Sequence, residues 1–315
     1  MKLSIVVPCY NEEENVRLFY NEVVKIFKKK KINYEIIFIN DGSSDRTIKV
    51  LKDISSNAKE NIKVINFSRN FGKEAAMYAG LKESKGKYVS IIDADLQQKP
   101  SLILDMLQIL ESDDEFDSVA TYQEKRKEKF LRRTFSNLFY KVINKVSDVK
   151  FVDGASDFRL FRRNMVNSII EMNEYYRFSK GIFSWVGFNT YYMPYEVDKR
   201  ATGDSKWSFT KLFSYALDGI ISFSTRPLTL ATLLGIIISL FSFTYLAIII
   251  IQTVIYGIDV PGYASLLVTV LLLGGIQLFA LGIIGEYLAR TYVETKRRPI
   301  YIAKEIIENN KKESN

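Results

Sequence analysis

Two long uncharged apolar runs near the C-terminus constrain this chain most strongly. They span Leu228–Ile255 and Tyr263–Gly285 and contain no Asp, Glu, Lys or Arg. Each exceeds the roughly 20 residues that a helix needs to cross a bilayer, and two such runs rarely occur as core helices of one soluble domain. We therefore expect two transmembrane helices, and we expect the part of the protein that precedes them to act at a membrane surface.

The flanks of these runs predict how the chain is oriented. The connector at residues 256–262 carries no Lys or Arg, whereas both outer flanks are basic. The basic flanking residues are Lys206, Lys211, Arg226, Arg290, Lys296, Arg297 and Arg298. The positive-inside rule then places the large N-terminal domain and both termini in the cytoplasm. Met1–Tyr10 is short and lacks a cleavage site typical of a signal peptide, so we expect a multi-pass protein of the cell membrane.

Composition excludes several kinds of chemistry. The chain has one cysteine, Cys9, and no histidine, which excludes an intrachain disulfide, Cys/His zinc sites and imidazole catalysis. A metal site would have to use oxygen ligands, which favours Mg²⁺ or Mn²⁺. The net charge is +8, with much of the excess near the expected membrane face. Anionic lipid is therefore the expected partner rather than nucleic acid, although the excess could also serve only to set topology.

The first half of the chain alternates strand and helix patterns. Strands are expected at Leu3–Val7, Tyr34–Ile39, Ile62–Phe67, Tyr88–Ile92 and near Ser118–Thr121. Helices are expected at Glu12–Lys30, Asp45–Ser55 and Lys73–Ser84 and after Pro100. This alternation predicts an α/β domain with a mostly parallel sheet and flanking helices. Ligands of such sheets bind outside the carboxyl ends of the strands. Three polar turns, Pro8–Glu12, Asn40–Asp45 and Asp93–Gln97, are expected there.

The turn after the fourth strand carries the strongest local signal. Asp93 and Asp95 are two carboxylates that repel one another unless a cation lies between them, and Gln97 adds an amide oxygen. One or two carboxylates with substrate phosphates are a usual set of Mg²⁺ ligands. Asp41, after the second strand, is placed to accept hydrogen bonds from a nucleoside, whereas Asp45 fits a helix N-cap.

Further stretches of the chain leave alternatives open. The loop Arg200–Trp207 could close over a diphosphate or be a plain basic loop. Asp157, in an apolar neighbourhood, could be a base or an orienting group. Leu131–Val146 and Phe209–Ile221 are amphipathic and could lie on a membrane surface or pack on the sheet. Small residues on one face of the second apolar run, at Gly275, Gly282 and Gly285, could pack the two spans together or join protomers into a homo-oligomer.

Five motifs in this order resemble one family. They are Val6–Glu12 (VVPCYNE), Asn40–Asp45 (NDGSSD), Asp93–Gln97 (DADLQ), Ser156–Leu160 (SDFRL) and Arg200–Trp207 (RATGDSKW). Together with the two apolar runs they resemble the polyprenyl-phosphate glycosyltransferases of glycosyltransferase family 2, which include the dolichyl-phosphate mannose synthases. The bacterial undecaprenyl-phosphate glucosyltransferases are the most similar branch. The resemblance covers nearly the whole chain.

The resemblance implies a GT-A-type fold and roles for individual residues. Pro8, Tyr10, Glu12 and Asp41 would hold the nucleoside of a UDP-hexose. Asp93, Asp95 and Gln97 would bind Mg²⁺ or Mn²⁺ on the diphosphate, with Asp95 also counted as catalytic. Arg200 and Lys206 would grip the diphosphate, Asp157 would be the base, and Arg126, Arg132 and Arg133 would meet the lipid phosphate. Two departures from the family pattern stand at Gln98–Pro100 and at Gln123 and Glu124, and the second weakens the lipid-phosphate assignment.

The expected function is inverting transfer of glucose from UDP-glucose to undecaprenyl phosphate, which yields a sugar donor for cell-envelope glycosylation. A processive polysaccharide synthase and a non-catalytic scaffold that binds nucleotide sugars are the alternatives. The expected parts are a cytoplasmic catalytic domain at 1–206, an amphipathic juxtamembrane helix at 207–226, two transmembrane helices within 227–289 and a cytoplasmic tail at 290–315. The polar end of that tail, Lys304–Asn315, is expected to fray.

Overall fold

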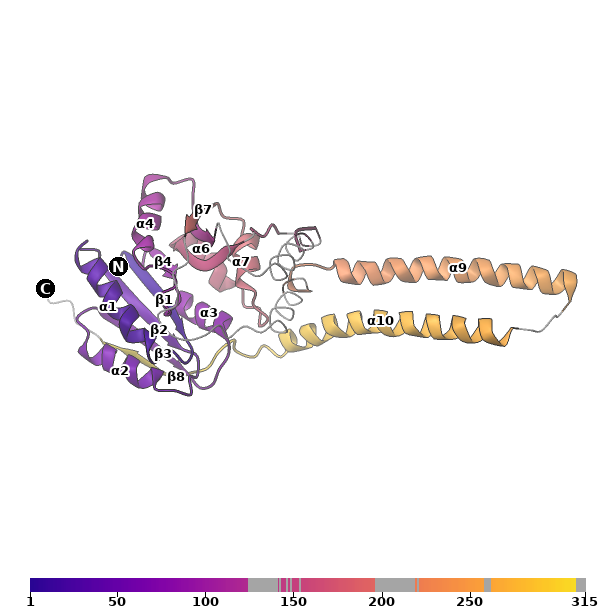
Figure 1. Cartoon of the computed structure of the whole chain (residues 1–315), viewed down its shortest axis with the longest axis horizontal. Coiled ribbons are helices and arrows are strands. Elements are labelled where there is room, and N and C mark those ends of the chain that lie inside the picture. The colour runs from indigo at the N-terminus through magenta and orange to yellow at the C-terminus, as the bar shows by residue number, and fades with distance from the viewer. Residues whose placement is uncertain are drawn as a thin grey trace. The chain divides into compact units, whose positions relative to one another are not determined.

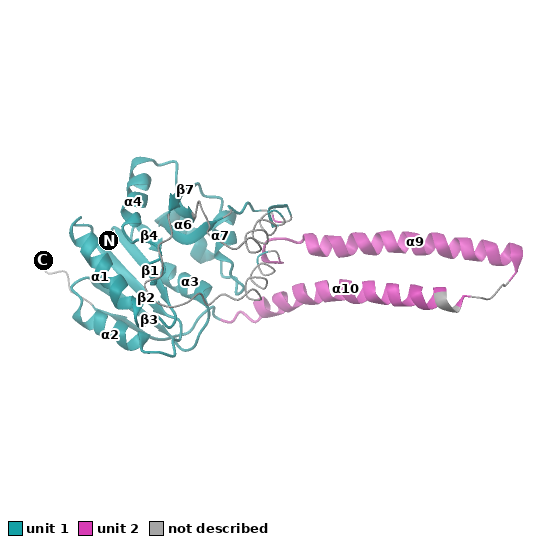
Figure 2. Ribbon diagram, viewed as in Figure 1, with its two compact units in different colours: residues 1–145, 149–219, 299–315 teal, residues 146–148, 220–298 magenta. Residues whose placement is uncertain are grey.

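The computed structural model describes residues 1–123, 141, 143–145, 147, 149–152, 154–195, 219, 221–257 and 262–309. The chain forms two compact units, coloured separately in Figure 2. Unit 1 comprises residues 1–145, 149–219 and 299–315, and unit 2 comprises residues 146–148 and 220–298. The predicted amphipathic stretches fall mostly outside the described residues, so the domain boundaries given above stay predictions.

An eight-stranded sheet organises unit 1, in the order β7-β5-β6-β4-β1-β2-β3-β8 (Figure 1). Its parallel centre consists of β1 (Leu3–Cys9), β2 (Tyr34–Asn40), β3 (Asn61–Phe67) and β4 (Tyr88–Ile91). The outer strands are β5 (Ser118–Gln123), β6 (Ala155–Arg162), β7 (Thr190–Tyr195) and β8 (Ala303–Glu308). Strand β6 runs antiparallel to β4 and β5, and β8 runs antiparallel to β3. The expected α/β class with a mostly parallel sheet is confirmed.

Helices cover both faces of this sheet because the central strands are apolar on both sides. The helices are α1 (Asn15–Lys28), α2 (Thr47–Asn57), α3 (Lys73–Glu83), α4 (Leu102–Ser112), α6 (Arg163–Glu171) and α7 (Ser179–Trp185). Helices α1, α2 and α4 share one core with alternate strand residues such as Ile5, Ile36 and Val64. Helix α3 packs on β1 and β2 from the other face and contacts α6.

The element boundaries follow the sequence pattern closely. The predicted strands from the first to the fifth are all present within about two residues, which is the usual uncertainty at element ends. Helix α1 begins at Asn15 rather than Glu12. The backbone N–H groups of Glu12 and Glu13 donate to Thr47 Oγ1 and Asp45 Oδ2, which holds the residues before the helix against the loop after β2. The expected strands did not include β6 and β8, which run antiparallel to their neighbours in the centre, or β7, which runs parallel to β5.

Strand β8 overturns one expectation about the tail. Ala303–Glu308 forms a ladder with β3 rather than fraying. Lys63 on β3 is 5% exposed and pairs with Glu308 on β8 at 2.7 Å and with Glu83 at the end of α3 at 3.0 Å. Burial alone would lower the pKa of Lys63. Its hydrogen bonds to Glu308 and Glu83 outweigh that effect, so the pKa stands above its ordinary value. The prediction that the tail frays is therefore wrong for residues 304–308.

Unit 2 contains the two apolar runs as helices α9 (Arg226–Tyr256) and α10 (Tyr263–Thr295). Both are long and apolar enough to cross a membrane, and none of the most apolar window of either helix is buried. The two candidate spans are therefore confirmed by length and composition. A Cβ added at Gly275, Gly282 or Gly285 would meet no atom of the described chain within 4 Å, so these glycines do not bring α9 and α10 together. Their role in a homo-oligomer stays a prediction.

Gly80 on α3 offers a test of how tightly this helix lies on the sheet. A Cβ at this position would lie 2.2 Å from Val6 Cγ1 and 2.9 Å from Ile39 Cδ1. Alanine favours a helix interior over glycine by about 1 kcal/mol, but overpacking a core costs about 1–3 kcal/mol. We predict that Gly80→Ala lowers the thermal unfolding midpoint of the purified protein, whereas Lys82→Ala on the exposed face of α3 does not. A midpoint that rises in Gly80→Ala would contradict this packing.

Candidate active site

The first two predicted turns interlock at the carboxyl ends of β1 and β2. The Asn11 N–H donates to Ser43 Oγ at 2.9 Å, and the Ser44 N–H donates back to Asn11 Oδ1 at 2.9 Å. Asn11 adopts a positive φ of 54°, a conformation that asparagine tolerates better than most residues. Because β1, β2 and β4 are adjacent and parallel, all three predicted turns lie at one edge of the sheet. This part of the prediction is confirmed.

Asp41 joins this edge to the loop before α3. Its carboxylate is 3% exposed and accepts hydrogen bonds from the backbone N–H groups of Phe71 at 2.7 Å and Gly72 at 3.0 Å. Burial raises the pKa of Asp41 to about 6, against the lowering effect of these two bonds. The neighbouring Gly42 has φ 61°, and a Cβ there would lie 2.3 Å from the carbonyl carbon of Arg69, so only glycine permits this approach. The predicted contact of Asp41 with a nucleoside is an additional role that no contact here tests.

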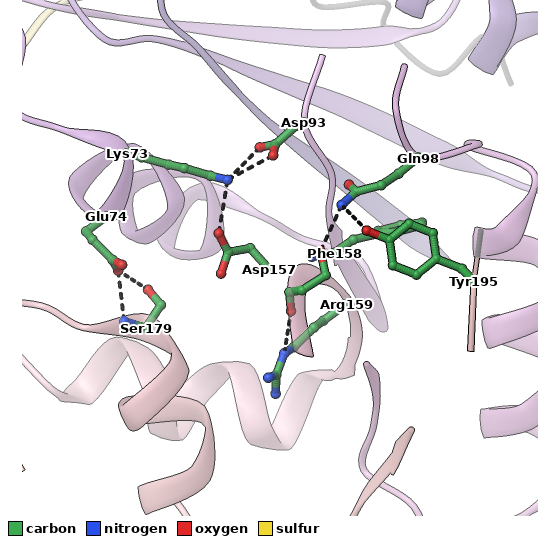
Figure 3. A network of polar contacts seen from close by, with 10 residues as sticks. Lys73, Glu74, Asp93, Gln98, Asp157, Phe158, Arg159, Ser179 and Tyr195 are labelled. Carbon is green, nitrogen blue, oxygen red and sulfur yellow. Dashed lines mark hydrogen bonds and ion pairs between the residues drawn. The ribbon is translucent and has the colours of Figure 1, made fainter. Parts of the chain in front are cut away.

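Lys73, the first residue of α3, lies between two of the predicted carboxylates (Figure 3). Its Nζ is 2.8 Å from Asp93 Oδ1 and 3.0 Å from Asp157 Oδ2. The sheet explains the meeting. Ile91 on β4 is registered with Arg159 on the antiparallel β6. Asp93, two residues after Ile91, therefore lies opposite Asp157, two residues before Arg159. Helix α3 then supplies the cation between them.

Charge fixes the protonation states of this cluster, which we call the carboxylate–lysine cluster. Burial alone would lower the pKa of Lys73, but the carboxylates of Asp93 and Asp157 outweigh it and raise that pKa. Burial alone would raise the pKa of Asp157, but Lys73, then Lys180 and Arg159, lower it to about 2. Lys73 is therefore a cation and Asp157 an anion throughout the neutral range.

The cluster retains capacity for a ligand. Asp157 Oδ1 is buried and has no hydrogen-bond partner among the residues that the structure describes. A buried carboxylate oxygen without a hydrogen bond costs free energy unless a ligand or a solvent molecule binds it. Asp93 and Asp157 share the ammonium group of Lys73, and Asp95 follows two residues after Asp93 in the chain. Carboxylates and the amide of Gln97 are the hard oxygen donors that a divalent cation prefers.

Asp95 and Gln97 form the turn that follows. The Gln97 N–H donates to Asp95 Oδ1 at 3.1 Å, and Leu96 between them has φ 57°. A branched apolar residue in this region of φ costs about 1–3 kcal/mol and is found chiefly where surrounding structure holds it. In the described part of the chain no three Asp, Glu or Cys side chains converge as a self-contained metal site requires. A metal at Asp93, Asp95 and Gln97 would thus complete its coordination with substrate oxygens.

Gln98 ties this turn to the strand that carries Asp157. Its Nε2 donates to Ser156 Oγ at 2.8 Å and approaches Tyr195 Oη on β7 at 3.5 Å. Gln98 was noted in the sequence only as a departure from the family pattern. In the structure it holds the Asp93–Gln97 turn against β6, next to Asp157.

Glu74 is a second functional candidate that the sequence did not reveal. Its Oε2 accepts hydrogen bonds from the backbone N–H of Ser179, at 2.9 Å, and from the Ser179 hydroxyl. Burial and then the charge of Asp157 raise the pKa of Glu74 to about 7, although the Ser179 bonds oppose the shift. Glu74 therefore holds α7 on α3 beside the carboxylate–lysine cluster, and it changes charge near neutral pH.

The remaining predicted residues fall into two groups. Pro8 is half-buried near the end of β1, and Tyr10 beyond the strand is 41% exposed. Glu12 Oε2 accepts a hydrogen bond from Asn15 Nδ2 at 2.7 Å, and all three residues lie at the same sheet edge. The basic residues of the predicted phosphate contacts lie outside the described residues. They are Arg126, Arg132, Arg133, Arg200 and Lys206.

The raised pKa of Glu74 predicts a specific pH dependence of stability. A carboxyl whose pKa is raised from 4.5 unfolded to about 7 folded contributes stability below the lower value that is lost as the pH rises through the higher one. We predict that the thermal midpoint of the wild type falls more between pH 5 and pH 8 than that of Glu74→Gln, in which the group stays neutral. If the thermal midpoint fell equally with pH in both proteins, the raised pKa of Glu74 would be contradicted. Asp41 and the other titrating groups are common to both proteins and cannot cause a difference between them.

Comparison with known proteins agrees with this geometry. A sequence model described as Glycosyl transferase family 2 matches residues 4–170, which include β1–β6 and the carboxylate–lysine cluster. An uncharacterized glycosyltransferase of Synechocystis sp. (strain ATCC 27184 / PCC 6803 / Kazusa) is 44% identical over 97% of this chain and 96% of its own. The bactoprenol glucosyl transferase of Shigella phage SfV is 40% identical over 96% of this chain and 98% of its own.

Among solved structures, the chain is similar to the crystal structure of glucosyl-3-phosphoglycerate synthase from Mycobacterium tuberculosis with Mn²⁺, UDP-glucose and phosphoglyceric acid. That likeness has a TM-score of 0.47 and 15% identity, over 70% of this chain and 77% of the other. The family match spans more than half of the chain, the two relatives are aligned over nearly all of it, and the α/β sheet with a parallel centre is the class of fold expected of the family. By its sequence, the chain belongs to glycosyl transferase family 2.

Proposed function

We propose that this protein transfers glucose from UDP-glucose to a polyprenyl phosphate, undecaprenyl phosphate, and inverts the anomeric carbon. The observation that carries the proposal is the carboxylate–lysine cluster at the carboxyl edge of the parallel sheet, where Lys73 Nζ lies 2.8–3.0 Å from Asp93 and Asp157. The choice of sugar and acceptor is supported by the relative named bactoprenol glucosyl transferase, which is 40% identical over nearly the whole chain.

The two interlocked turns are the proposed nucleoside site. Pro8, Tyr10 and Glu12 follow β1, and Asp41 follows β2 at the same edge. The exposed ring of Tyr10 offers a surface on which a base can stack. Asp41 is fixed by the N–H groups of Phe71 and Gly72, which leaves lone pairs of its carboxylate for a hydroxyl or an N–H of the nucleoside.

The proposed metal site comprises Asp93, Asp95 and Gln97. A Mg²⁺ or Mn²⁺ ion bound there would neutralise charge on the donor's diphosphate as it leaves. The described residues fit such an ion only with substrate oxygens completing its coordination, as argued above, so the proposal links metal binding to donor binding. Arg200 and Lys206 are proposed to contact the same diphosphate, and Arg126, Arg132 and Arg133 the phosphate of the lipid.

In the proposed reaction an oxygen of the lipid phosphate attacks the anomeric carbon. The new carbon–oxygen bond forms as the bond to the diphosphate oxygen breaks, and UDP leaves with the bonding electron pair. The second pKa of a phosphate monoester is near ~6, so the attacking oxygen carries its charge already and needs no proton removed. Asp157, with a pKa of about 2, is a weak base. We therefore assign it an orienting and electrostatic role.

The membrane arrangement is part of the proposal. Helices α9 and α10 would anchor the enzyme in the cell membrane as two spans, with the catalytic domain and both termini on the cytoplasmic side, where nucleotide sugars are available. The basic flanks and the connector without Lys or Arg support this orientation. The product, a polyprenyl-phosphate glucose, would serve as a sugar donor for glycosylation of the cell envelope.

The function is tested by incubating the purified full-length protein with undecaprenyl phosphate, Mg²⁺ and a panel of UDP- and GDP-hexoses. We expect one glycolipid carrying a single sugar, formed fastest from UDP-glucose, with release of UDP. A growing polymer would identify a processive synthase instead. Binding of a nucleotide sugar with no transfer to any acceptor would identify a scaffold, and a faster reaction with another donor would correct the sugar.

The metal assignment has its own test. Asp95→Ala removes a carboxylate from the turn after β4, so we predict loss of metal-dependent transfer to about one hundredth of wild type or less, the size typical of losing one electrostatic contact to the leaving group. Wild-type activity should disappear with a chelator and return with Mg²⁺ or Mn²⁺. Asp105→Ala on α4 is the matched control. Transfer that persists unchanged in the chelator would remove the metal from the proposal.

Asp157 is tested by an isosteric change. Asp157→Asn keeps the volume of the side chain but removes the charge that pairs with Lys73. We predict that turnover falls while UDP-glucose still binds, as measured by initial rates and by titration calorimetry with UDP. Near-normal turnover would end the assignment. Loss of UDP binding in parallel with turnover would show instead that Asp157 only holds the donor site together.

A further inference from the structure

The segment around the C-terminal strand β8 is linked to the candidate active site of unit 1 through two separate series of contacts, here called routes. The first is aromatic. Tyr301, just before β8, stacks on Phe67 at the end of β3, with ring centroids 4.9 Å apart and an interplanar angle of 18°. Phe67 in turn meets Phe71 edge-on, with centroids 5.7 Å apart. Phe71 is the residue whose N–H bonds to Asp41, and Lys73 lies two residues beyond it.

The second route is polar and crosses three adjacent strands. Glu305 on β8 accepts a hydrogen bond from Asn66 Nδ2 at 2.9 Å, and Asn66 Oδ1 accepts one from Asn40 Nδ2 at 2.7 Å. Sheet register brings these residues together, because Asn40 pairs with Asn66 and Asn66 pairs with Glu305. Asn40 immediately precedes Asp41 in the chain, so this ladder ends one residue before the carboxylate that bonds to Phe71 on the aromatic route.

The backbone fixes where the two routes diverge. The ladder between β3 and β8 shifts register between Asn66 and Phe67, and the Ser68 N–H donates to the carbonyl of Ile302 at 2.9 Å. Such irregularities re-aim side chains and are frequent beside active sites. Here the shift lets neighbouring residues of β3 serve different routes, one polar and one aromatic.

From these contacts we infer that Tyr301 and Glu305 are positioning residues for the transfer reaction. Neither is proposed to touch substrate. Tyr301 acts through Phe67 and Phe71 on the Phe71–Lys73 loop, and Glu305 acts through Asn66 and Asn40 on Asp41. Together they hold the corner where Asp41, the loop and the carboxylate–lysine cluster meet. Small displacements of such groups lower rates steeply. The kinetic part of this inference rests on the proposed function.

The test uses the full-length protein with two test variants and three control variants. Tyr301→Ala removes the stacked ring, and Tyr301→Phe restores it. Glu305→Ala ends the polar ladder, whereas Lys52→Ala removes only the exposed ion pair of Glu305, whose nitrogen and oxygen lie 2.8 Å apart, and leaves its bond to Asn66. Ile306→Ala alters an exposed side chain of the same strand and controls for general effects on β8.

The first measurement is hydrogen exchange, which does not depend on the reaction. We expect faster exchange in the peptide that covers Ser68–Met77 in Tyr301→Ala and in Glu305→Ala, and unchanged exchange in α1, because local opening is confined to the supported corner. Tyr301→Phe, Lys52→Ala and Ile306→Ala should match wild type. Exchange that rises equally in α1 would mean that β8 only stabilises the domain, and this would overturn the inference.

The second measurement separates KM from kcat for UDP-glucose. We expect kcat/KM to fall about tenfold or more in Tyr301→Ala, less than the hundredfold that a displacement of about 1 Å can cause, with a raised KM and recovery in Tyr301→Phe. Simple loss of folded enzyme would lower the apparent kcat at constant KM, and that result would overturn the inference, as would wild-type kinetics in both alanine variants. A wild type that transfers no sugar would instead refute the proposed function, and the exchange data would still decide whether the corner depends on β8.

Discussion

The ammonium group of Lys73 lies between Asp93 and Asp157, 2.8 Å from one and 3.0 Å from the other, and three parts of the fold depend on that position. Asp93 follows β4 of the parallel centre, and Asp157 lies near the start of the antiparallel strand β6. Lys73 is the first residue of α3, the helix that packs on β1 and β2. Without a cation, two carboxylates at this separation repel and one of them takes up a proton. The ammonium group of Lys73 offsets this repulsion, and it lowers the pKa of Asp157.

The same cluster is the place where the proposed function puts a divalent cation. Asp157 Oδ1 remains without a hydrogen-bond partner among the described residues, although Lys73, Lys180 and Arg159 all lower the pKa of this carboxyl. In the proposed reaction, a divalent ion that arrives with a diphosphate would bring oxygen ligands that the protein does not supply. The fold would then hold the carboxylates apart before the substrate binds, which would leave little reorganisation for the reaction itself.

Local sequence patterns predicted the parallel centre of the fold because there each strand is a short, mostly apolar run and the strands alternate with helical segments. They also placed Asp41, Asp93 and Asp95 at one edge, since topology alone brings the carboxyl ends of parallel strands together. Asp157 came from its motif, but its position opposite Asp93 depends on the antiparallel register of β6 with β4. No local pattern encodes that register, because the two strands are far apart in the chain.

Lys73 and Glu74 were missed for a related reason. The loop after β3 ends at the same edge as the three polar turns, and a lysine at the start of the next helix was visible in the sequence, but nothing local distinguishes it from a solvated first turn. Its function depends on partners at Asp93 and Asp157, 20 and 84 residues away. Ser179, the partner of Glu74, is 105 residues away. Side chains that act through tertiary contacts are invisible to periodicity.

The C-terminal strand is a segment for which the sequence pattern predicted disorder and the structure shows a strand. Lys304–Asn315 is polar and has the composition of a frayed tail, yet Ala303–Glu308 lies in the sheet. Polar and apolar residues do not alternate along β8, because the half-buried positions include Glu305 and the exposed ones include Ile306. The strand is stabilised instead by its partners on β3. Lys63 is nearly buried between Glu308 and Glu83, and leaving such an ammonium group unpaired would be strongly unfavourable. Because the residue that needs the tail belongs to β3, the segment that follows the second apolar helix is part of the same domain as the carboxylates.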